Sequence, residues 1–315
     1  MSQVSLTLAV GEYDRTDPLI RGEVRVPGVD LTVVPMSDAW LRHQRMIRHE
    51  AFDVAELSMS SFLMAKERGQ RLWAIPVFPY RMFRHQFVLV WEARVGEPAA
   101  LRGKRVATPM YQTTTMLWVR GFLKHQFGIL PEEIQWVTER EELVPVSPPG
   151  VHITVSPEPV EQLFRRGEAD ALVLIEEIPE DLLALPGVRR LFPNYPEVEE
   201  AYYRQTGIYP MMHAVVFREA VLERHPWLGR SLYDGFVEAL RLSLERERHP
   251  RVLNLAWASH YFERERQIFG GSPYVYGVAA NRPSLEALVR YSHEQGLTSR
   301  QMGLDELFWP ELLDT

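Results

Sequence analysis

The sequence contains no cysteine in its 315 residues. This absence excludes disulfide bonds, thiolate metal ligands and a cysteine nucleophile. Lysine is also scarce, because the basic residues are nearly all arginine and the lysines are only Lys66, Lys104 and Lys124. Each of the three lies in a polar stretch, so we expect all of them to be solvated. Chemistry through a lysine Schiff base therefore has no support in the sequence.

Long apolar runs are missing as well. No run approaches the roughly 18 apolar residues that a membrane-spanning helix needs. Residues 1–10 lack a basic segment and contain only a short apolar run, which predicts a first strand and not a secretory signal. We therefore expect a cytoplasmic location and no membrane partner. A net charge of −7 likewise argues against nucleic acid as the main partner.

Patterns typical of strands and helices alternate along most of the chain, which predicts an α/β fold with mostly parallel sheets. The expected strands are Ser5–Val10, Leu31–Val34, Phe52–Leu57, Leu72–Phe78, Phe87–Trp91, Arg105–Thr108, Ile134–Val137, Val151–Val155, Ala171–Ile175 and Met212–Phe217. The main expected helices are 38–49, with Asp38 as its N-cap, 60–68, 113–127, 159–166, 197–205, 219–224, 228–248, 252–269 and 284–295.

Two of these strands predict a division into two lobes. Phe87–Trp91 and Met212–Phe217 have no crossover helix beside them, as expected for strands that cross between lobes. We therefore expect a two-lobed fold in which each lobe is a mostly parallel sheet flanked by helices. Residues 1–100 with 206–315 form the first lobe and residues 101–205 the second. A ligand cleft is expected between the two lobes.

The segment Pro79–Gln86, between two apolar runs, carries Arg81, Arg84 and His85. Guanidinium groups at such a junction are costly to bury unless an anion meets them, and an arginine fork matches a carboxylate. Histidine exchanges protons near neutral pH. The segment therefore indicates a pocket for an aromatic or small organic acid, while structural salt bridges at a domain edge remain the other interpretation.

Further candidates follow from the rule that ligands of open α/β sheets bind beyond the carboxyl ends of the strands. They are Tyr13, Asp14 and Arg15 after the first strand, Ser58 and Ser60 after the third, Tyr111, Gln112, Thr113 and Thr114 at a helix start, Glu176 after Ala171–Ile175, and His213 on a returning strand. The helix start offers backbone N–H groups to a carboxylate. Structural roles stay open for all of them: helix caps, a local salt bridge, or a satisfied core histidine.

The other histidines lie on polar helix faces or in loops, and we expect them at the surface. They are His43, His49, His125, His152, His225, His249, His260 and His293. No two histidines have a convincing zinc spacing, so we expect no metal site. No Gly-x-Ser-x-Gly elbow, P-loop or dinucleotide-binding glycine motif occurs, which leaves hydrolase, kinase and Rossmann oxidoreductase functions without support.

Nine segments carry a family resemblance that spans nearly the whole chain. They are Gly11–Arg15, Phe52–Ser61, Ile75–His85, Leu101–Val106, Trp118–Gly121, Arg189–Pro193, Glu199–Arg204, Thr206–His213 and Tyr276–Val278. On these segments the chain resembles the 4,5-dihydroxyphthalate decarboxylase family. The resemblance implies a type II periplasmic-binding-protein fold and a decarboxylase that releases carbon dioxide from 4,5-dihydroxyphthalate, giving protocatechuate without a cofactor.

That activity suggests a role for each candidate. Arg84, together with Arg81 or the helix start named above, holds the carboxylate that stays on the ring. His85 or His213 delivers a proton to the ring carbon that loses its carboxylate, and Asp14 or the other histidine polarises the phenol. The expected partner is a small aromatic carboxylate, and homo-oligomer formation is left open.

Two other functions compete with this interpretation. A non-catalytic solute-binding protein for a small, aromatic carboxylate would bind its ligand without turnover. An enzyme similar to thiamine-pyrimidine synthase is the third, but the lysines are poorly placed for pyridoxal phosphate and no iron-binding histidine cluster is visible. Because the expected chemistry runs without a cofactor, we predict none.

Overall fold

A computed structural model describes residues 3–249, 251 and 253–315. Contacts between Cα atoms divide the chain into two compact units. Unit 1 comprises Met1–Arg81, Met211–Leu285 and Met302–Thr315, and unit 2 comprises Met82–Pro210 and Glu286–Gln301. Unlike the predicted lobes, these units place residues 82–100, 206–210 and 286–301 in unit 2. The predicted lobe limits themselves stay a prediction.

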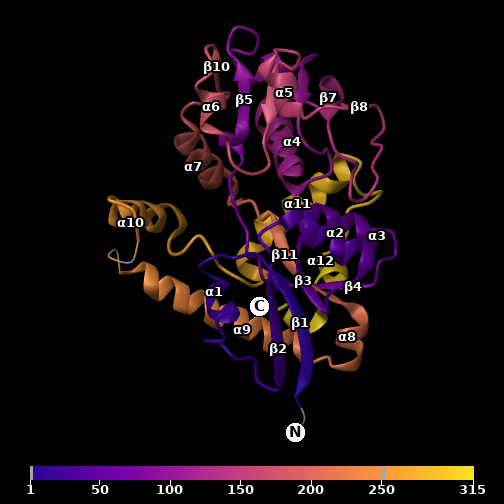
Figure 1. Cartoon of the computed structure of the whole chain (residues 1–315), viewed down its shortest axis with the longest axis vertical. Helices are drawn as coiled ribbons and strands as arrows, with labels where there is room; N and C mark the ends of the chain where they lie inside the picture. Colours follow the sequence, from indigo (N-terminus) through magenta and orange to yellow (C-terminus); the bar gives the residue numbers. More distant parts are fainter. Residues whose placement is uncertain (1–2, 250, 252) are drawn as a thin grey trace. The chain divides into compact units, whose positions relative to one another are not determined.

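Unit 1 is built on a five-stranded sheet with the strand order β2-β1-β3-β11-β4 (Figure 1). The strands are β1 (Val4–Val10), β2 (Val29–Pro35), β3 (Val54–Ser58), β4 (Leu72–Ile75) and β11 (His213–Arg218). β1 pairs in parallel with β2 and β3, whereas β11 runs antiparallel to β3 and β4. β11 enters this sheet without a crossover helix, which accounts for its antiparallel direction.

The helices of unit 1 are α1 (Asp17–Ile20), α2 (Ala39–His49), α3 (Met59–Glu67), α8 (Glu219–Arg224), α9 (Leu228–Glu247), α10 (Ala258–Phe269) and α12 (Leu304–Leu307), with 3₁₀ turns at η5 (Ala279–Asn281) and η6 (Pro310–Leu312). Helices such as α9 pack against the sheet and bury its apolar side chains, whereas α10 is mostly exposed and buries only Ala258. One core cluster joins Leu8 of β1 and Phe217 of β11 to Phe236 of α9. Asp38 caps α2 as predicted, because its side chain accepts a hydrogen bond from the Leu41 N–H at 2.9 Å.

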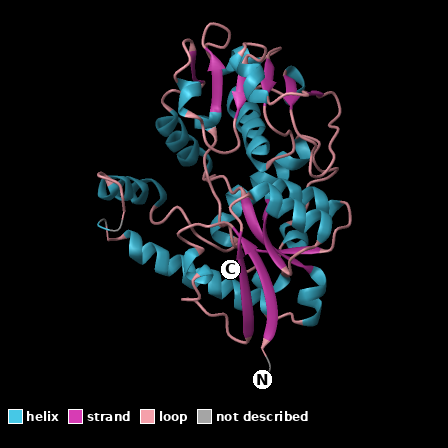
Figure 2. Cartoon of the chain, in the orientation of Figure 1, coloured by secondary structure: helices cyan, strands magenta, loops and turns pink. Residues whose placement is uncertain are grey.

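Unit 2 contains a six-stranded mixed sheet with the order β10-β5-β9-β6-β7-β8. Figure 2 colours the strands magenta and the helices cyan. The strands are β5 (Val88–Trp91), β6 (Arg105–Ala107), β7 (Gln135–Thr138), β8 (His152–Val155), β9 (Ala171–Val173) and β10 (Val188–Arg190). Strands β6 to β9 pair in parallel, and β5 is antiparallel to both β9 and β10. β5, like β11, is a strand for which the sequence shows no crossover helix.

The helices of unit 2 are α4 (Thr114–Phe127), α5 (Val160–Arg165), α6 (Glu180–Leu183), α7 (Tyr195–Thr206) and most of α11 (Arg282–Glu294), with 3₁₀ turns at η1 (His85–Phe87), η2 (Pro98–Leu101) and η3 (Pro131–Glu133). Thr113 caps α4 by accepting from the Met116 N–H at 3.3 Å. Gly128 ends the helix in the left-handed conformation, at φ 65°.

Several predicted elements differ from the structure at their ends. β4 stops at Ile75 because Pro76 follows it and offers no N–H to a neighbouring strand. Residues 85–87 form a 3₁₀ turn, so β5 begins one residue later than predicted. The helix expected over 252–269 is described only from Ala258, and position 252 lies outside the described residues.

Lys66 of α3 corrects the expectation that all three lysines are solvated. It is half-buried, and its Nζ donates to the Leu72 carbonyl oxygen at 2.5 Å and lies 3.8 Å from the centre of the Trp73 ring. Burial lowers the pKa of this ammonium group. The lysine therefore packs its charged end on an aromatic face, a contact that the polar stretch around it does not predict.

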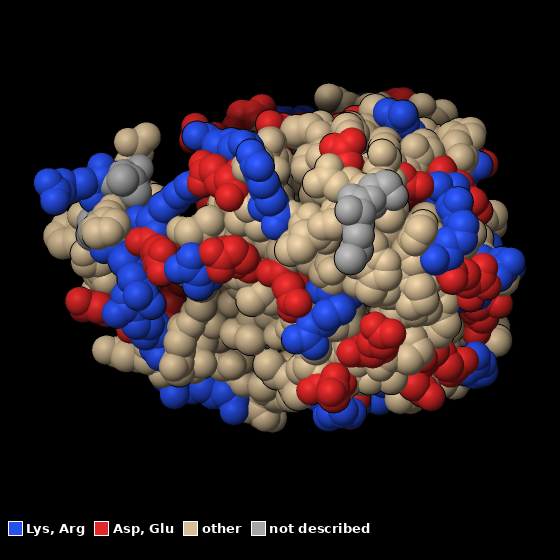
Figure 3. Space-filling model, turned by 90° about the horizontal axis from the view of Figure 1, so that it is seen from below, with Lys and Arg blue, Asp and Glu red and all other residues tan. Residues whose placement is uncertain are grey.

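No helix in the described ranges is long and apolar enough to cross a membrane. On the face seen in Figure 3, lysine and arginine side chains are interspersed with aspartate and glutamate side chains.

Candidate functional site

A buried carboxylate in unit 1 gathers polar groups from two strands, a helix and the turn after β1. Glu56 of β3 is paired with Val215 of β11, and His213 lies two residues before Val215 on the same face of the sheet. The side chains of Glu56 and His213 are therefore diagonal neighbours, and the Nδ1 atom of His213 lies 2.5 Å from Glu56 Oε1. Sheet register thus brings together two residues that are 157 positions apart.

Two more groups donate hydrogen bonds to the same carboxylate, and a cation pairs with it. The Tyr13 hydroxyl donates to Glu56 Oε1 at 2.9 Å, and the Gly11 N–H donates to Glu56 Oε2 at 2.8 Å. The guanidinium of Arg42 forms an ion pair with Glu56 at 3.1 Å, and both side chains are fully buried. We call Gly11, Tyr13, Arg42, His43, Glu56 and His213 the Glu56 cluster.

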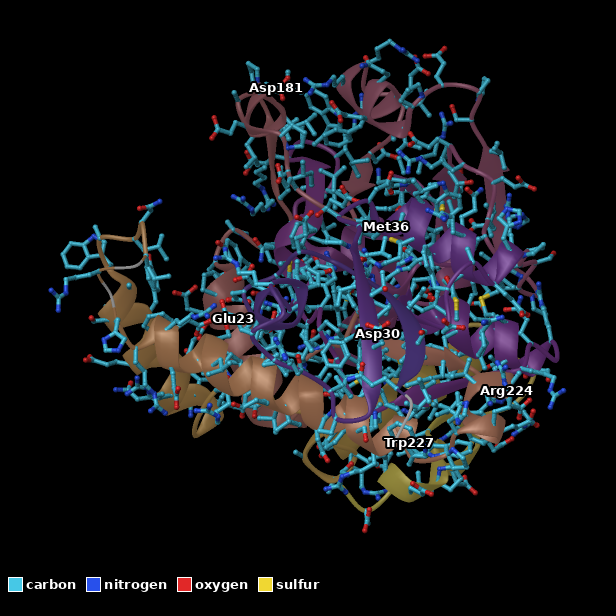
Figure 4. The ribbon with its side chains drawn as sticks, turned by 60° about the horizontal axis from the view of Figure 1, so that its bottom comes forward. Glu23, Asp30, Met36, Asp181, Arg224 and Trp227 are labelled. Carbon is cyan, nitrogen blue, oxygen red and sulfur yellow. The ribbon has the colours of Figure 1, made fainter. Side chains whose placement is uncertain are left out.

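The local chain is shaped for these contacts. A Cβ atom on Gly11 would lie 2.5 Å from the Tyr13 ring, so only glycine allows the tyrosine to fold back over the end of β1. Arg42 is held by hydrogen bonds from its guanidinium to the Glu56 and Met36 carbonyl oxygens. Met36, labelled in Figure 4, directly follows β2.

The electrostatics of the cluster keep Glu56 ionised. Burial by itself raises the pKa of Glu56, but the Arg42 charge, the His213 ring and the Gly11 N–H more than offset this and hold the pKa well below its usual range. Burial, followed by the Glu56 charge, raises the pKa of the Tyr13 hydroxyl, so Tyr13 stays a neutral donor. A charged carboxylate surrounded by donors favours a proton on His213 Nδ1 and leaves proton exchange to Nε2.

His43 was expected at the surface, and this prediction is wrong. It is buried at 6% exposure on α2, and its ring lies edge-on to His213 with 4.7 Å between centroids. Burial, the neighbouring His213 and Arg42 lower the pKa of His43 well below its usual value, so it is neutral. The polar sequence around His43 hides the fact that α2 turns this part of its surface toward β3.

The other predicted residues of unit 1 lie in two groups. Ser58 and Ser60 contact each other, with 3.3 Å between their hydroxyl oxygens. The exposed Asp14 forms an ion pair at 2.8 Å with Arg15, whose side chain is mostly buried and whose guanidinium lies 4.4 Å from the Tyr13 ring centre. The structure places Glu56, and not Asp14, against His213.

Arg81, the last predicted residue of unit 1, is buried. Its Nη1 donates to the Asn281 amide oxygen at 2.6 Å, and its carbonyl oxygen accepts from the Tyr274 hydroxyl at 3.2 Å. These contacts hold the chain at the point where unit 1 ends.

In unit 2, His85 lies inside an aromatic group. Its ring stacks on Phe122 at 4.0 Å between centroids and meets Phe192 and Tyr202 edge-on. Its Nε2 is 3.1 Å from the Gln126 amide oxygen, and its Nδ1 is 3.7 Å from Glu199. The neighbouring Arg84 is also buried and donates from Nη1 to the Ile175 carbonyl oxygen at 3.1 Å.

The predicted helix start in unit 2 already holds a carboxylate. The backbone N–H groups of Tyr111 and Gln112 donate to Glu142 at 2.6 and 3.0 Å. Thr113 caps α4, and Thr114 is its first residue. Glu176 is exposed and lines a cavity of about 280 Å³ together with residues such as Pro109, Glu139 and Glu161.

Sequence reasoning missed Glu56, Arg42 and Glu142. For Glu56 a signal existed, because it is the one charged residue in the apolar run Val54-Ala55-Glu56-Leu57, where a carboxylate needs partners to be buried. No comparable signal marks Arg42 or Glu142, which lie in polar stretches. Within the described ranges, no three histidine, cysteine, aspartate or glutamate side chains are grouped as a metal site requires.

Solved structures identify the class of fold. The periplasmic aliphatic sulphonate binding protein SsuA from Escherichia coli matches with a TM-score of 0.60 and 15% identity over 100% of both chains. SsuA from Xanthomonas axonopodis pv. citri bound to MOPS matches with a TM-score of 0.55 and 13% identity, over 99% of this chain and 98% of that one. At these identities the likeness shows the fold alone, and it confirms the predicted periplasmic-binding-protein fold class.

Sequence relatives identify the family. A 4,5-dihydroxyphthalate decarboxylase from Comamonas testosteroni is 32% identical over 100% of this chain and 99% of its own length. A protein of the same name from Pseudomonas putida is 36% identical over 55% of this chain and 71% of its own length. The chain belongs to the 4,5-dihydroxyphthalate decarboxylase family, which confirms the predicted membership of a carboxy-lyase family. No protein-family model matches the chain.

Proposed function

We propose that this protein decarboxylates a hydroxylated aromatic acid, with 4,5-dihydroxyphthalate as its substrate. The observation that carries the proposal is the 32% identity to a 4,5-dihydroxyphthalate decarboxylase over the full length of both chains. The Glu56 cluster adds chemical support, because a histidine oriented by an ionised buried carboxylate is suited to proton transfer.

The reaction needs no electron sink outside the ring. A phenol para to the departing carboxylate loses its proton, and the ring carbon that bears the carboxylate takes up a proton. The resulting dienone loses carbon dioxide as the carbon–carbon bond breaks, and the bonding electrons restore the aromatic ring. The protein has to supply an acid, a base and a cation or N–H group for the carboxylate that remains.

Within this proposal the acid is His213, and His85 is the alternative. Contacts support His213, since Glu56 holds its ring through Nδ1, whereas the His85 ring stacks among aromatic side chains. A positioned acid or base contributes roughly 10²–10⁴ in rate. Glu56 is then a positioning residue that acts through His213, and Asp14 stays a candidate base for the phenol.

The binding roles are proposed as they were predicted from the sequence. Arg84, with Arg81 or the backbone at Tyr111–Thr114, holds the carboxylate that remains, because buried guanidinium and N–H groups favour an anion. Tyr13, Arg15, Ser58, Ser60 and Glu176 complete the proposed binding residues. The cytoplasmic location and the absence of a cofactor also stay predictions.

A non-catalytic binding protein for a small aromatic carboxylate is the second candidate function. The similarity of the fold to sulphonate-binding proteins supports it. It predicts ligand binding with no product, so one experiment separates the two functions.

The experiment is to incubate chelator-treated protein with 4,5-dihydroxyphthalate and to measure carbon dioxide and protocatechuate. Turnover without added ions supports a metal-independent decarboxylase. A thermal shift without turnover favours the binding protein, unless divalent ions restore activity. If the protein neither converts nor binds 4,5-dihydroxyphthalate, the substrate assignment is wrong.

Variants then test the proton donor. His213→Ala is expected to lower turnover by about 10²–10⁴ while it retains ligand binding. His85→Ala is measured beside it, and His49→Ala, at an exposed position on α2, is the matched control. If His213→Ala and His85→Ala both keep full turnover, the assignment of the acid is wrong.

A further inference from the structure

The carboxylate of Glu142 is bound in unit 2 in the way that a carboxylate ligand would be bound. One of its oxygens accepts from the Tyr111 N–H at 2.6 Å and the other from the Gln112 N–H at 3.0 Å. These two successive N–H groups stand just before the Thr113 cap of the 14-residue helix α4. Backbone donors at the start of a helix favour an anion.

A buried cation beside this position is a second and independent observation. Arg120 of α4 is 1% exposed, and its Nη1 and Nε donate to the Tyr111 carbonyl oxygen at 2.7 Å and to Gln295 at 2.8 Å. Its remaining nitrogen, Nη2, has no hydrogen-bond partner within the described part of the chain. A buried guanidinium with an open donor favours a negative charge nearby, and Glu142 interacts with it electrostatically.

Glu142 reaches this position from a connecting segment and not from a helix or strand. It belongs to the segment between β7 and β8, where Leu143 and Val144 are buried and anchor the chain. Burial raises the pKa of Glu142 even though the two N–H groups and Arg120 act to lower it. The two N–H groups and Arg120 therefore do not fully offset the burial of this carboxylate.

We propose that the Tyr111 and Gln112 N–H groups and the Arg120 guanidinium form a carboxylate subsite, and that Glu142 occupies this subsite until a ligand carboxylate displaces it. The inference deepens the proposed function and rests on it for the class of ligand, an aromatic carboxylate. Glu142 is then an internal competitor that lowers the apparent affinity of the ligand by the fraction of molecules in which the subsite is filled.

The test measures phthalate binding by calorimetry in the full-length protein. Phthalate carries both carboxylates but lacks the ring hydroxyl that turnover needs. Glu142→Ala removes the competitor and is expected to bind phthalate about 10-fold more tightly, because a competing contact of about 1.4 kcal/mol corresponds to a factor of ten. The phthalate affinity of Glu142→Gln is expected to lie between those of the natural protein and Glu142→Ala. Glu141→Ala, at an exposed neighbouring position, serves as the matched control.

A second measurement does not depend on a variant. Phthalate added to the natural protein is expected to shift the backbone amide resonances of Tyr111 and Gln112. Unchanged or weaker phthalate binding by a folded Glu142→Ala variant would overturn the inference and assign Glu142 a structural role. Unshifted amide resonances would overturn it even if Glu142→Ala does not fold.

The two proposals fail in different ways. Tighter phthalate binding by Glu142→Ala without any decarboxylation would leave the subsite standing and refute the proposed function. If the natural protein decarboxylates its substrate but Glu142→Ala binds phthalate no more tightly, the proposed function stands and the subsite is refuted.

Discussion

Each unit contains a buried histidine beside a buried glutamate, and the two pairs differ in what surrounds the carboxylate. In unit 1, Glu56 contacts His213 at 2.5 Å, accepts hydrogen bonds from Tyr13 and Gly11, and pairs with the Arg42 charge. In unit 2, Glu199 lies 3.7 Å from His85, and within the described residues its Oε1 has no hydrogen-bond donor.

This difference shows that burial of a histidine and a glutamate side by side does not define their chemistry. The Glu56 cluster supplies a cation and N–H and O–H donors, which keep a carboxylate charged in a dry interior. The surroundings of His85 are the rings of Phe122, Phe192 and Tyr202, which stabilise an imidazole by stacking. We therefore expect the first arrangement to position a proton and the second to act mainly in packing.

The largest stability effect is expected for Glu56→Ala. The substitution leaves the Arg42 guanidinium buried without its charge partner, which costs about 3–5 kcal/mol of unfolding free energy. Urea denaturation at pH 7 measures this loss. Glu199→Ala is the matched variant in unit 2 and is expected to cost less, because among the described residues no buried guanidinium pairs with Glu199. An equal loss in the two variants would contradict the comparison.

The Glu56 carboxylate also makes stability depend on pH in the acid range. Because the pKa of Glu56 is lower in the folded protein than in the unfolded chain, its contribution is fully present above the usual value of 4.5 and declines as the pH falls below it. Glu56→Gln cannot titrate, so the variant should lose less stability than the natural protein between pH 5 and pH 3. A parallel loss in both proteins would show that other carboxylates dominate.

His85→Ala is expected to act mainly on stability. Removing a ring packed against three aromatic side chains leaves a cavity, at a cost of about 2–4 kcal/mol. Turnover of the folded variant should fall less than in His213→Ala. Thermal unfolding and product formation, measured on one preparation of His85→Ala, show whether the variant loses stability or turnover. A fully stable variant without turnover would make His85 the acid.

Tyr13→Phe tests a single donor to Glu56. The hydroxyl donates to a charged oxygen, so its removal is expected to cost about 1.5–3 kcal/mol. The measurement is urea denaturation of the natural protein, Tyr13→Phe and the matched Tyr195→Phe variant in unit 2. A change below about 0.5 kcal/mol would mean that water replaces the lost donor without cost.

Glu247→Gln is expected to have the smallest effect on stability, and it should stabilise the protein where the other substitutions destabilise it. Glu247 of α9 lines a cavity of about 380 Å³, and burial followed by the neighbouring Asp14 and Glu265 raises its pKa to about 7. A raised carboxyl pKa means that stability falls as the pH rises from about 4.5 to 7.

The variant should therefore be more stable than the natural protein at pH 8, by about 1 kcal/mol once solvent screening of a half-buried group is taken into account. Thermal unfolding between pH 5 and pH 8 measures the difference. Glu245→Gln, at an exposed position of the same helix, is the control and should change little. A difference between the two proteins that does not depend on pH would contradict the expected titration.

Some site residues were predictable from their local setting. His213 stood out as a polar residue in the apolar run Met211–Phe217, and the helix start at Tyr111–Thr114 was expected to favour a carboxylate. That Glu142 itself meets this helix start was not predictable, because nothing near Glu142 in the sequence indicates that it contacts residues about 30 positions away.

The sequence by itself determined the alternation of strands and helices, the fold class and the family, because these follow from patterns that are local or spread along the whole chain. The tertiary structure alone decided which carboxylate meets which histidine. Glu56 contacts His213 across 157 residues because β3 and β11 are neighbours in a particular register, and Arg42 joins them from a helix packed on β3. Strand order and register depend on the packing of the entire unit, so no segment of the chain carries that information alone.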